Sequence, residues 1–153
     1  NTPAAERALA TEPSMVLLCD GDLGASAGNL KPLVDAVRNG DADLAIAKFA
    51  RRVGGGFGLA LGASRKAVEK RTGQTLDAPL SGQRALTPQA LRTVLPFAKG
   101  FGMETAMNID ALRAGLRVRE VELDLEHRAT GRTAAGFAHR GRQLLDIYRA
   151  SRR

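Results

Sequence analysis

The stretch SMVLLCDGDLG, residues 14–24, decides the fold of this chain. Residues 15–19 are a short apolar run, bounded by Pro13 and Ser14 on one side and by glycines on the other. This pattern predicts a buried strand that ends abruptly in a polar turn. Carboxylates at the carboxyl end of such a strand lie at the rim of an open α/β sheet, where ligands bind.

Asp20 and Asp22 stand in that turn with one glycine between them. Two hard oxygen ligands this close suit Mg²⁺ or Mn²⁺, which proteins commonly share with the phosphates of a substrate. The alternative is that both aspartates only form the turn. Cys19 lies within the apolar run, so we expect it to be a small buried hydrophobe and not a nucleophile.

The length of the chain predicts one domain over residues 1–153, and its charge predicts anionic partners. The chain is 44% hydrophobic and 25% charged, and Lys plus Arg outnumber Asp plus Glu by 23 to 16. Such a surplus favours phosphorylated small molecules, nucleic acid or acidic lipid. Aromatic residues are only 4%, which argues against a stacking platform for single-stranded nucleic acid. The single cysteine fits a reducing compartment, and neither a membrane-spanning stretch nor a secretory signal is found, so we predict a cytoplasmic protein.

Helical and strand patterns alternate along the chain, which predicts a mixed sheet flanked by helices. We expect helices over residues 4–10, 29–38, 59–71, 88–94, 103–114 and 137–148, and strands over residues 15–19, 43–49 and 117–127. Residues 81–84 are expected to form a polar hinge before a helix that Thr87 caps and Pro88 begins. The glycine cluster at residues 54–58 is read as a flexible loop beside the site, with a phosphate cradle as the alternative.

Three further side chains are candidates for chemistry, each with a structural alternative. Arg84 either binds phosphate or is a plain surface arginine. Glu104 shares a helix face with Asn108, one turn away, but a carboxylate in a first turn also complements the helix dipole. His127 follows its strand as Asp20 follows the first one, so it is either a ligand or a structural histidine.

Four blocks of sequence, in their order and spacing, resemble the inverting GT-A glycosyltransferases. The family includes dolichyl-phosphate mannose synthases and glucosyl-3-phosphoglycerate synthase. The blocks are the Asp-x-Asp segment LLCDGDLG, the Ser-Gly-x-Arg-Ala segment PLSGQRAL, the segment GFGME, and GLRVREV with the later His-Arg pair at His127 and Arg128. The resemblance covers nearly the whole chain.

The resemblance implies transfer of a sugar from a nucleotide-diphosphate donor with inversion at the anomeric carbon. Glu104 would be the general base, and Mg²⁺ or Mn²⁺ would be held by Asp22 and Asp20, with His127 completing the metal shell or binding the diphosphate. A phosphorylated or polyprenyl-phosphate acceptor, and hence peripheral contact with the inner face of the membrane, is compatible with this family. The implied substrate-binding residues are Asp20, Ser81, Gly82, Arg84, Arg128 and Arg132.

Two other classes of function stay open at this point. A nucleotidyltransferase would also use the two aspartates, and a non-catalytic basic module for nucleic acid or acidic membrane would explain the charge. Members of the family begin with further βα units that hold the nucleotide base. We therefore expect this chain to be the C-terminal portion of a GT-A domain, with the apolar edge of the strand at residues 15–19 covered by preceding sequence or by a second chain, as in a homodimer.

Overall fold

The computed structural model describes residues 2–19, 24–49, 58–98, 100–123 and 148. Within them the chain forms four strands, five α-helices and two 3₁₀ helices. The strands are β1 (Val16–Leu18), β2 (Leu44–Phe49), β3 (Arg84–Leu86) and β4 (Val118–Leu123). The helices are α1 (Thr2–Leu9), η1 (Gly24–Leu30), α2 (Lys31–Arg38), α3 (Gly58–Thr72), α4 (Pro88–Val94), η2 (Gly100–Gly102) and α5 (Met103–Arg113).

The four strands form one mixed sheet in the order β1-β3-β2-β4. Strand β3 is antiparallel to both of its neighbours, and β2 is parallel to β4. Consequently β1, β2 and β4 all run in one direction and their carboxyl ends lie at one edge of the sheet. We call this edge the carboxyl edge, and β3 begins there.

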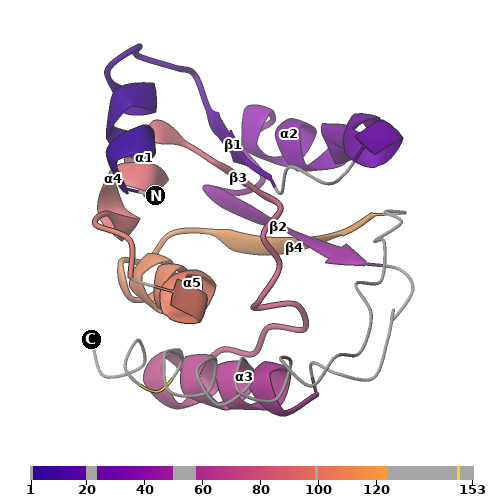
Figure 1. Ribbon diagram of the computed structural model, residues 1–153, viewed down its shortest axis with the longest axis vertical. Helices are drawn as coiled ribbons and strands as arrows, with labels where there is room; N and C mark the ends of the chain where they lie inside the picture. The colour runs from indigo at the N-terminus through magenta and orange to yellow at the C-terminus, as the bar shows by residue number, and fades with distance from the viewer. Residues whose placement is uncertain (1, 20–23, 50–57, 99, 124–147, 149–153) are drawn as a thin grey trace.

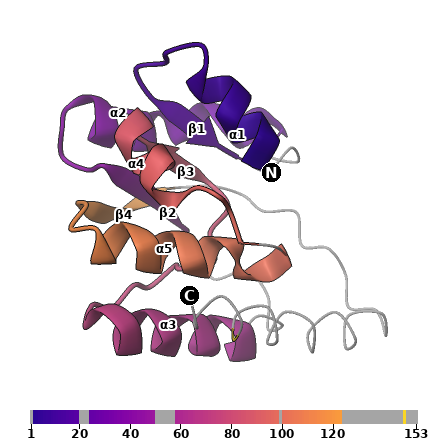
Figure 2. The same ribbon diagram turned by 90° about the vertical axis from the view of Figure 1, so that its left-hand side faces the viewer.

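Each face of the sheet carries its own apolar cluster. One face packs against α2 through small side chains of the strands, such as Ala45, Ala47 and Ala85, which meet Leu33 and Val37 of the helix. The opposite face is covered by α1, α4 and α5 through a larger cluster that includes Ile46, Leu86, Leu91 and Ile109. Figures 1 and 2 both show α5 lying between the sheet and α3.

The position of α5 between two layers explains its composition. Ala106, Met107 and Ala111 form the apolar stripe that the sequence predicted, and all three are buried. Thr105 and Asn108 lie outside that stripe and are also fully buried. The hydroxyl of Thr105 is 2.7 Å from the hydroxyl of Ser64 on α3, so the second buried face of α5 is a polar contact with the outer helix.

The predicted elements within the described residues are confirmed, with three corrections, and the helix expected over residues 137–148 lies outside the described residues apart from residue 148. The predicted hinge at residues 81–84 ends in a strand, since β3 begins at Arg84 and pairs on both sides in the middle of the sheet. Strand β1 lies at the edge of the described sheet and is only half-buried, with Leu17 39% exposed. Cys19 directly follows this edge strand and is exposed, so the prediction of a buried cysteine is wrong.

Candidate active site at the carboxyl edge

The topology brings several of the predicted functional segments to the carboxyl edge of the sheet. Leu18, the last residue of β1, stands two residues before Asp20 in the sequence. Leu123 ends β4 four residues before His127 in the sequence, and Ser81 and Gly82 stand three and two residues before Arg84, the first residue of β3. The described ends of these segments are spread over the chain from residue 18 to residue 123, and the pairing of the strands places them along one edge of the sheet.

Four of the predicted site residues, Ser81, Gly82, Arg84 and Glu104, lie in the part of the chain that the structure describes. The others, Asp20, Asp22, His127, Arg128 and Arg132, lie outside the described residues, as do most of the glycines at 54–58. Among the described residues no group of three or more His, Cys, Asp or Glu side chains could hold a metal ion. No described helix is long and apolar enough to cross a membrane.

Arg84 is the most deeply buried charged residue of this region. In the register of the sheet it pairs with Leu18 on one side and with Ile46 on the other. Its side chain is 1% exposed, so the alternative of a plain surface arginine is wrong. Burial lowers the pKa of Arg84 to about 10, against the opposing effect of the nearby carboxylates of Glu104 and Glu120. The guanidinium therefore remains a cation at neutral pH.

The three nitrogen atoms of the Arg84 guanidinium each donate to an oxygen atom of the protein. Nε donates to the carbonyl of Ser81 at 2.7 Å, and Nη2 donates to the carbonyl of Pro79 at 2.9 Å. Nη1 donates to Oδ1 of Asn108 at 2.6 Å. Charge-assisted hydrogen bonds of this length are among the stronger polar contacts in proteins. Arg84 therefore ties the chain before β3 to helix α5.

Helix α5 carries Glu104 in its first turn and Asn108 one turn later. Asn108 is fully buried, and its amide nitrogen donates to the carbonyl of Pro79 at 2.9 Å. Glu104 is half-buried, and its negative charge lies close enough to Arg84 to oppose part of the lowering of the Arg84 pKa by burial. The first turn of α5 thus lies beside the segment that leads into Ser81 and Gly82, which joins two of the predicted site segments.

Ser81 and Gln83 complete the entry into β3. Ser81 is 7% exposed, and its hydroxyl lies 3.4 Å from Oε1 of the fully buried Gln83. The carbonyl of Gln83 accepts a hydrogen bond of 3.0 Å from the backbone N–H of Ala47 on β2. The predicted substrate-binding residues Ser81 and Gly82 therefore precede a strand whose position is fixed by its neighbours.

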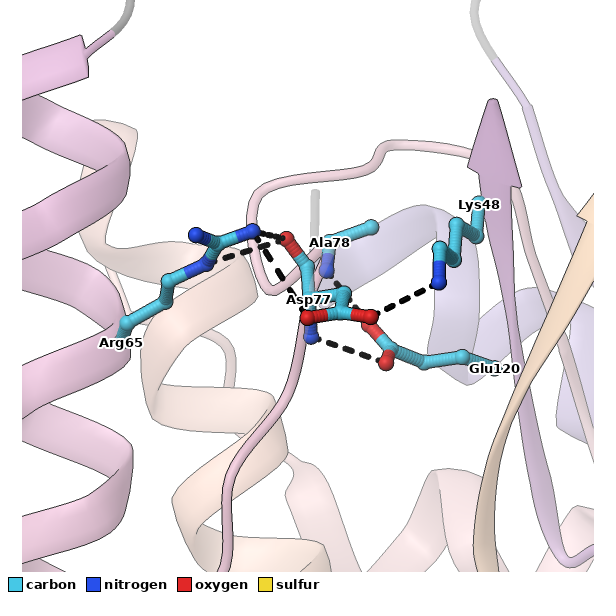
Figure 3. Close-up of polar contacts among 5 residues, drawn as sticks. All are labelled: Lys48, Arg65, Asp77, Ala78 and Glu120. Atoms are coloured by element: carbon cyan, nitrogen blue, oxygen red, sulfur yellow. Dashed lines mark hydrogen bonds and ion pairs between the residues drawn. The ribbon is translucent and has the colours of Figure 1, made fainter. Parts of the chain in front are cut away.

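A polar cluster that no sequence pattern predicted lies beside this segment. Glu120 of β4 accepts hydrogen bonds from the backbone N–H groups of Asp77, at 2.8 Å, and Ala78, at 2.5 Å. The side chain of Asp77 lies 2.7 Å from Lys48 and 3.8 Å from Arg65 (Figure 3). A glutamate that alternates with apolar residues along a strand predicts only a solvated face, so no local signal could have identified Glu120.

The comparisons with known proteins agree with this geometry. No protein-family model matches the chain, and no curated protein matches it. Among solved structures, glucosyl-3-phosphoglycerate synthase from Mycobacterium tuberculosis in complex with phosphoglyceric acid superposes with a TM-score of 0.72 at 27% identity, covering 97% of this chain and 52% of that one. The same enzyme with Mn²⁺, UDP-glucose and phosphoglyceric acid gives 0.70 at 26% identity, covering 99% of this chain and 54% of that one.

A third complex of that enzyme, with Mn²⁺, UDP and glucosyl-3-phosphoglycerate, superposes with a TM-score of 0.71 at 27% identity, covering 98% of this chain and 53% of that one. The chain therefore spans about half the length of these structural neighbours. The predicted fold class is confirmed, because the mixed sheet with its flanking helices is the GT-A fold of these glycosyltransferases.

Proposed function

We propose that this chain is part of a metal-dependent glycosyltransferase that moves a sugar from a nucleotide-diphosphate donor to a phosphorylated acceptor, with inversion. The observation that carries the proposal is the convergence of the Leu18, Ser81 and Leu123 segments at one edge of a GT-A sheet. The complexes of the structural neighbour with UDP-glucose, Mn²⁺ and phosphoglyceric acid support the same donor, metal and acceptor classes.

The residue types of the proposed metal site fit the ion. Asp20 and Asp22 offer carboxylate oxygens, the donors that Mg²⁺ and Mn²⁺ prefer, and the imidazole of His127 would be a third, softer donor. The ends of β1 and β4 are three strand spacings apart, which is roughly 14 Å. Asp20 and Asp22 are two and four residues beyond the end of β1, and His127 is four residues beyond the end of β4. Each extended residue spans about 3.4 Å. Chain length is therefore sufficient for the three ligands to meet.

The remaining roles follow from chemistry. The bound metal would supply positive charge where the leaving diphosphate becomes more negative. Glu104 would take the proton of the attacking acceptor hydroxyl. Arg128 and Arg132 would clamp phosphate oxygens with their planar forks, and Ser81 and Gly82 would contact substrate. For Arg84 we propose a different role below, because its guanidinium is buried and directed at protein oxygens.

Isothermal titration calorimetry tests the proposal. UDP-glucose is titrated into the protein with Mn²⁺ and again with excess chelator, and we expect binding only with the metal. Asp22→Ala should abolish this binding while the circular dichroism spectrum stays unchanged. His127→Ala should weaken binding of UDP more than binding of uridine, since its proposed contact is to the metal or the diphosphate.

The rival functions give different results in the same experiment. Preferred binding of nucleoside triphosphates would favour a nucleotidyltransferase, and heat that does not depend on metal would favour a basic binding module. We place this reaction in the cytoplasm. Vesicle sedimentation measures membrane contact, and analytical ultracentrifugation measures dimer formation.

A further inference from the structure

Residues 77–81, which we call the 77–81 segment, connect α3 to the edge of the sheet without being helix or strand. Pro79 within it is fully buried and Ser81 nearly so. Backbone N–H and C=O groups that leave water need hydrogen-bond partners, and a strand or helix would normally supply them. In this segment side chains from other elements supply many of them.

One side of the segment is held through its N–H groups. The carboxylate of Glu120 accepts from the consecutive amides of Asp77 and Ala78, 43 and 42 residues away in the sequence (Figure 3). A carboxylate that receives two backbone N–H groups makes charge-assisted hydrogen bonds and fixes both peptide planes. The side chain of Asp77 forms ion pairs with Lys48 and Arg65, which solvent screens. Arg65 also donates to the backbone carbonyl of Asp77, at 3.2 Å from Nε and 2.5 Å from Nη2.

The other side is held through its C=O groups. The guanidinium of Arg84 donates to the carbonyls of Pro79 and Ser81, and Asn108 also donates to that of Pro79. These groups are buried, so the bonds are not screened as the exposed pairs are. Arg84 on β3 therefore binds C=O groups of the 77–81 segment, and Glu120 on β4 binds its N–H groups. The two strands lie on either side of β2.

We propose that Arg84 and Glu120 are paired positioning residues, which hold the 77–81 segment in the conformation that presents Ser81 and Gly82 at the carboxyl edge. Neither residue is assigned to contact substrate. The tie between Arg84 and Asn108 also keeps the segment in register with the first turn of α5, where Glu104 lies. The consequence for catalysis rests on the proposed function, whereas the positioning itself does not.

Amide-resolved hydrogen exchange by NMR tests the positioning without any substrate. The variant is Glu120→Gln, and the control is Glu122→Gln, which removes the same charge two residues along the same strand from an exposed site. The informative amide is that of Ser81, which donates to the carbonyl of Ala78 at 3.1 Å and does not touch Glu120. We expect its exchange to accelerate about tenfold in Glu120→Gln and not in the control.

Two results would overturn the positioning role. Glu120 would make only a local contact if exchange rose at Asp77 and Ala78 alone. It would be a general stability residue if exchange rose equally throughout the sheet. Arg84→Lys provides a second variant, because it retains the charge but cannot reach three oxygens as a fork. Arg84→Lys should accelerate hydrogen exchange at Ser81 as well. Exchange at the wild-type rate there would show that Arg84 is not a positioning residue.

Steady-state kinetics then separates this inference from the proposed function. In a protein that transfers glucose, Glu120→Gln should lower kcat/KM for the acceptor about tenfold while the dissociation constant of UDP-glucose in calorimetry stays within about twofold. An inactive wild-type protein with accelerated exchange in the variant would refute the proposed function and leave the positioning intact. An active wild-type protein, together with unchanged exchange in Glu120→Gln, would support the proposed function and refute the positioning.

Discussion

Glu104 stands in the first turn of α5, close to the buried guanidinium of Arg84. If it is the general base, Glu104→Gln removes the basicity with little change of shape. We expect turnover to fall by at least about 100-fold while affinity for UDP-glucose barely moves. Steady-state kinetics and calorimetry on the same preparations measure the two effects.

The matched control is Glu69→Gln, which removes an exposed carboxylate from α3 and should leave turnover unchanged. The structural alternative for Glu104 predicts another pattern, since a first-turn carboxylate stabilises a helix by about 0.3–1 kcal/mol through the dipole. Retained turnover with a lower melting temperature would therefore reduce Glu104 to a helix-dipole residue.

The side chains of Asp43 and Arg117 join the beginnings of β2 and β4, at the edge of the sheet opposite the candidate site. The Arg117 guanidinium donates to both carboxylate oxygens of Asp43, at 2.9 and 3.0 Å. These contacts hold the pKa of Asp43 below its ordinary value. Because the folded-state pKa is lowered, the pair stabilises the fold above the unfolded pKa of about 3.9, and this stabilisation disappears as the pH falls.

Asp43→Asn should therefore destabilise the protein at pH 7, and the difference from wild type should shrink as the pH falls below about 4. Urea unfolding at several pH values measures it. Asp41→Asn, an exposed carboxylate two residues away, serves as the control. A difference between Asp43→Asn and wild type that stays constant down to pH 3 would contradict the assignment.

At the scale of elements, α4 is stabilised by a side chain that the sequence already identified. The hydroxyl of Thr87 accepts a hydrogen bond of 3.1 Å from the N–H of Ala90, and Pro88 occupies the first turn. Thr87→Ala should lower the free energy of unfolding by about 1 kcal/mol, because an N-terminal amide loses its partner. Thr87→Ser should restore most of the loss in chemical denaturation.

Thr93→Ala gives the comparison within the same helix. The hydroxyl of Thr93 donates to the carbonyl of Gln89 at 2.9 Å on an exposed surface, so it supplies no N-terminal amide with an acceptor. Its replacement should change the free energy of unfolding by less than about 0.5 kcal/mol. Equal effects of the two alanine variants would show that the cap contributes nothing specific.

For the whole molecule, the net charge of +7 predicts that ionic strength controls donor binding. A nucleotide diphosphate is an anion, and its attraction to a basic surface is screened as the Debye length falls from about 30 Å at 0.01 M salt to about 8 Å at 0.15 M. We expect the dissociation constant of UDP-glucose to rise several-fold over this range, measured by calorimetry in Mn²⁺. Uridine, which lacks the phosphates, is the control, and an equal rise for both would contradict an electrostatic origin.

Features that depend on neighbours within a few residues could be predicted before the fold was known. The apolar run at 15–19, the cap at Thr87 and the apolar stripe of α5 are local patterns, and the structure has the corresponding elements. Order and spacing of four short blocks were also sufficient to predict the GT-A fold, which the structural comparisons confirm.

The position of β3 in the sheet, and the contacts of the residues around it, depend on packing between distant parts of the chain. Arg84–Leu86 begins with an arginine and has no β-branched or aromatic residue, so it carries no local strand signal. It becomes a strand because β1 and β2 supply hydrogen bonds on both sides. The exposure of Cys19 depends on packing as well. So do the hydrogen bonds from Arg84 and Glu120 to the 77–81 segment, one of which joins residues 43 positions apart in the sequence. Such contacts leave no periodicity in the sequence, because the two partners are brought together by the sheet and not by the chain between them.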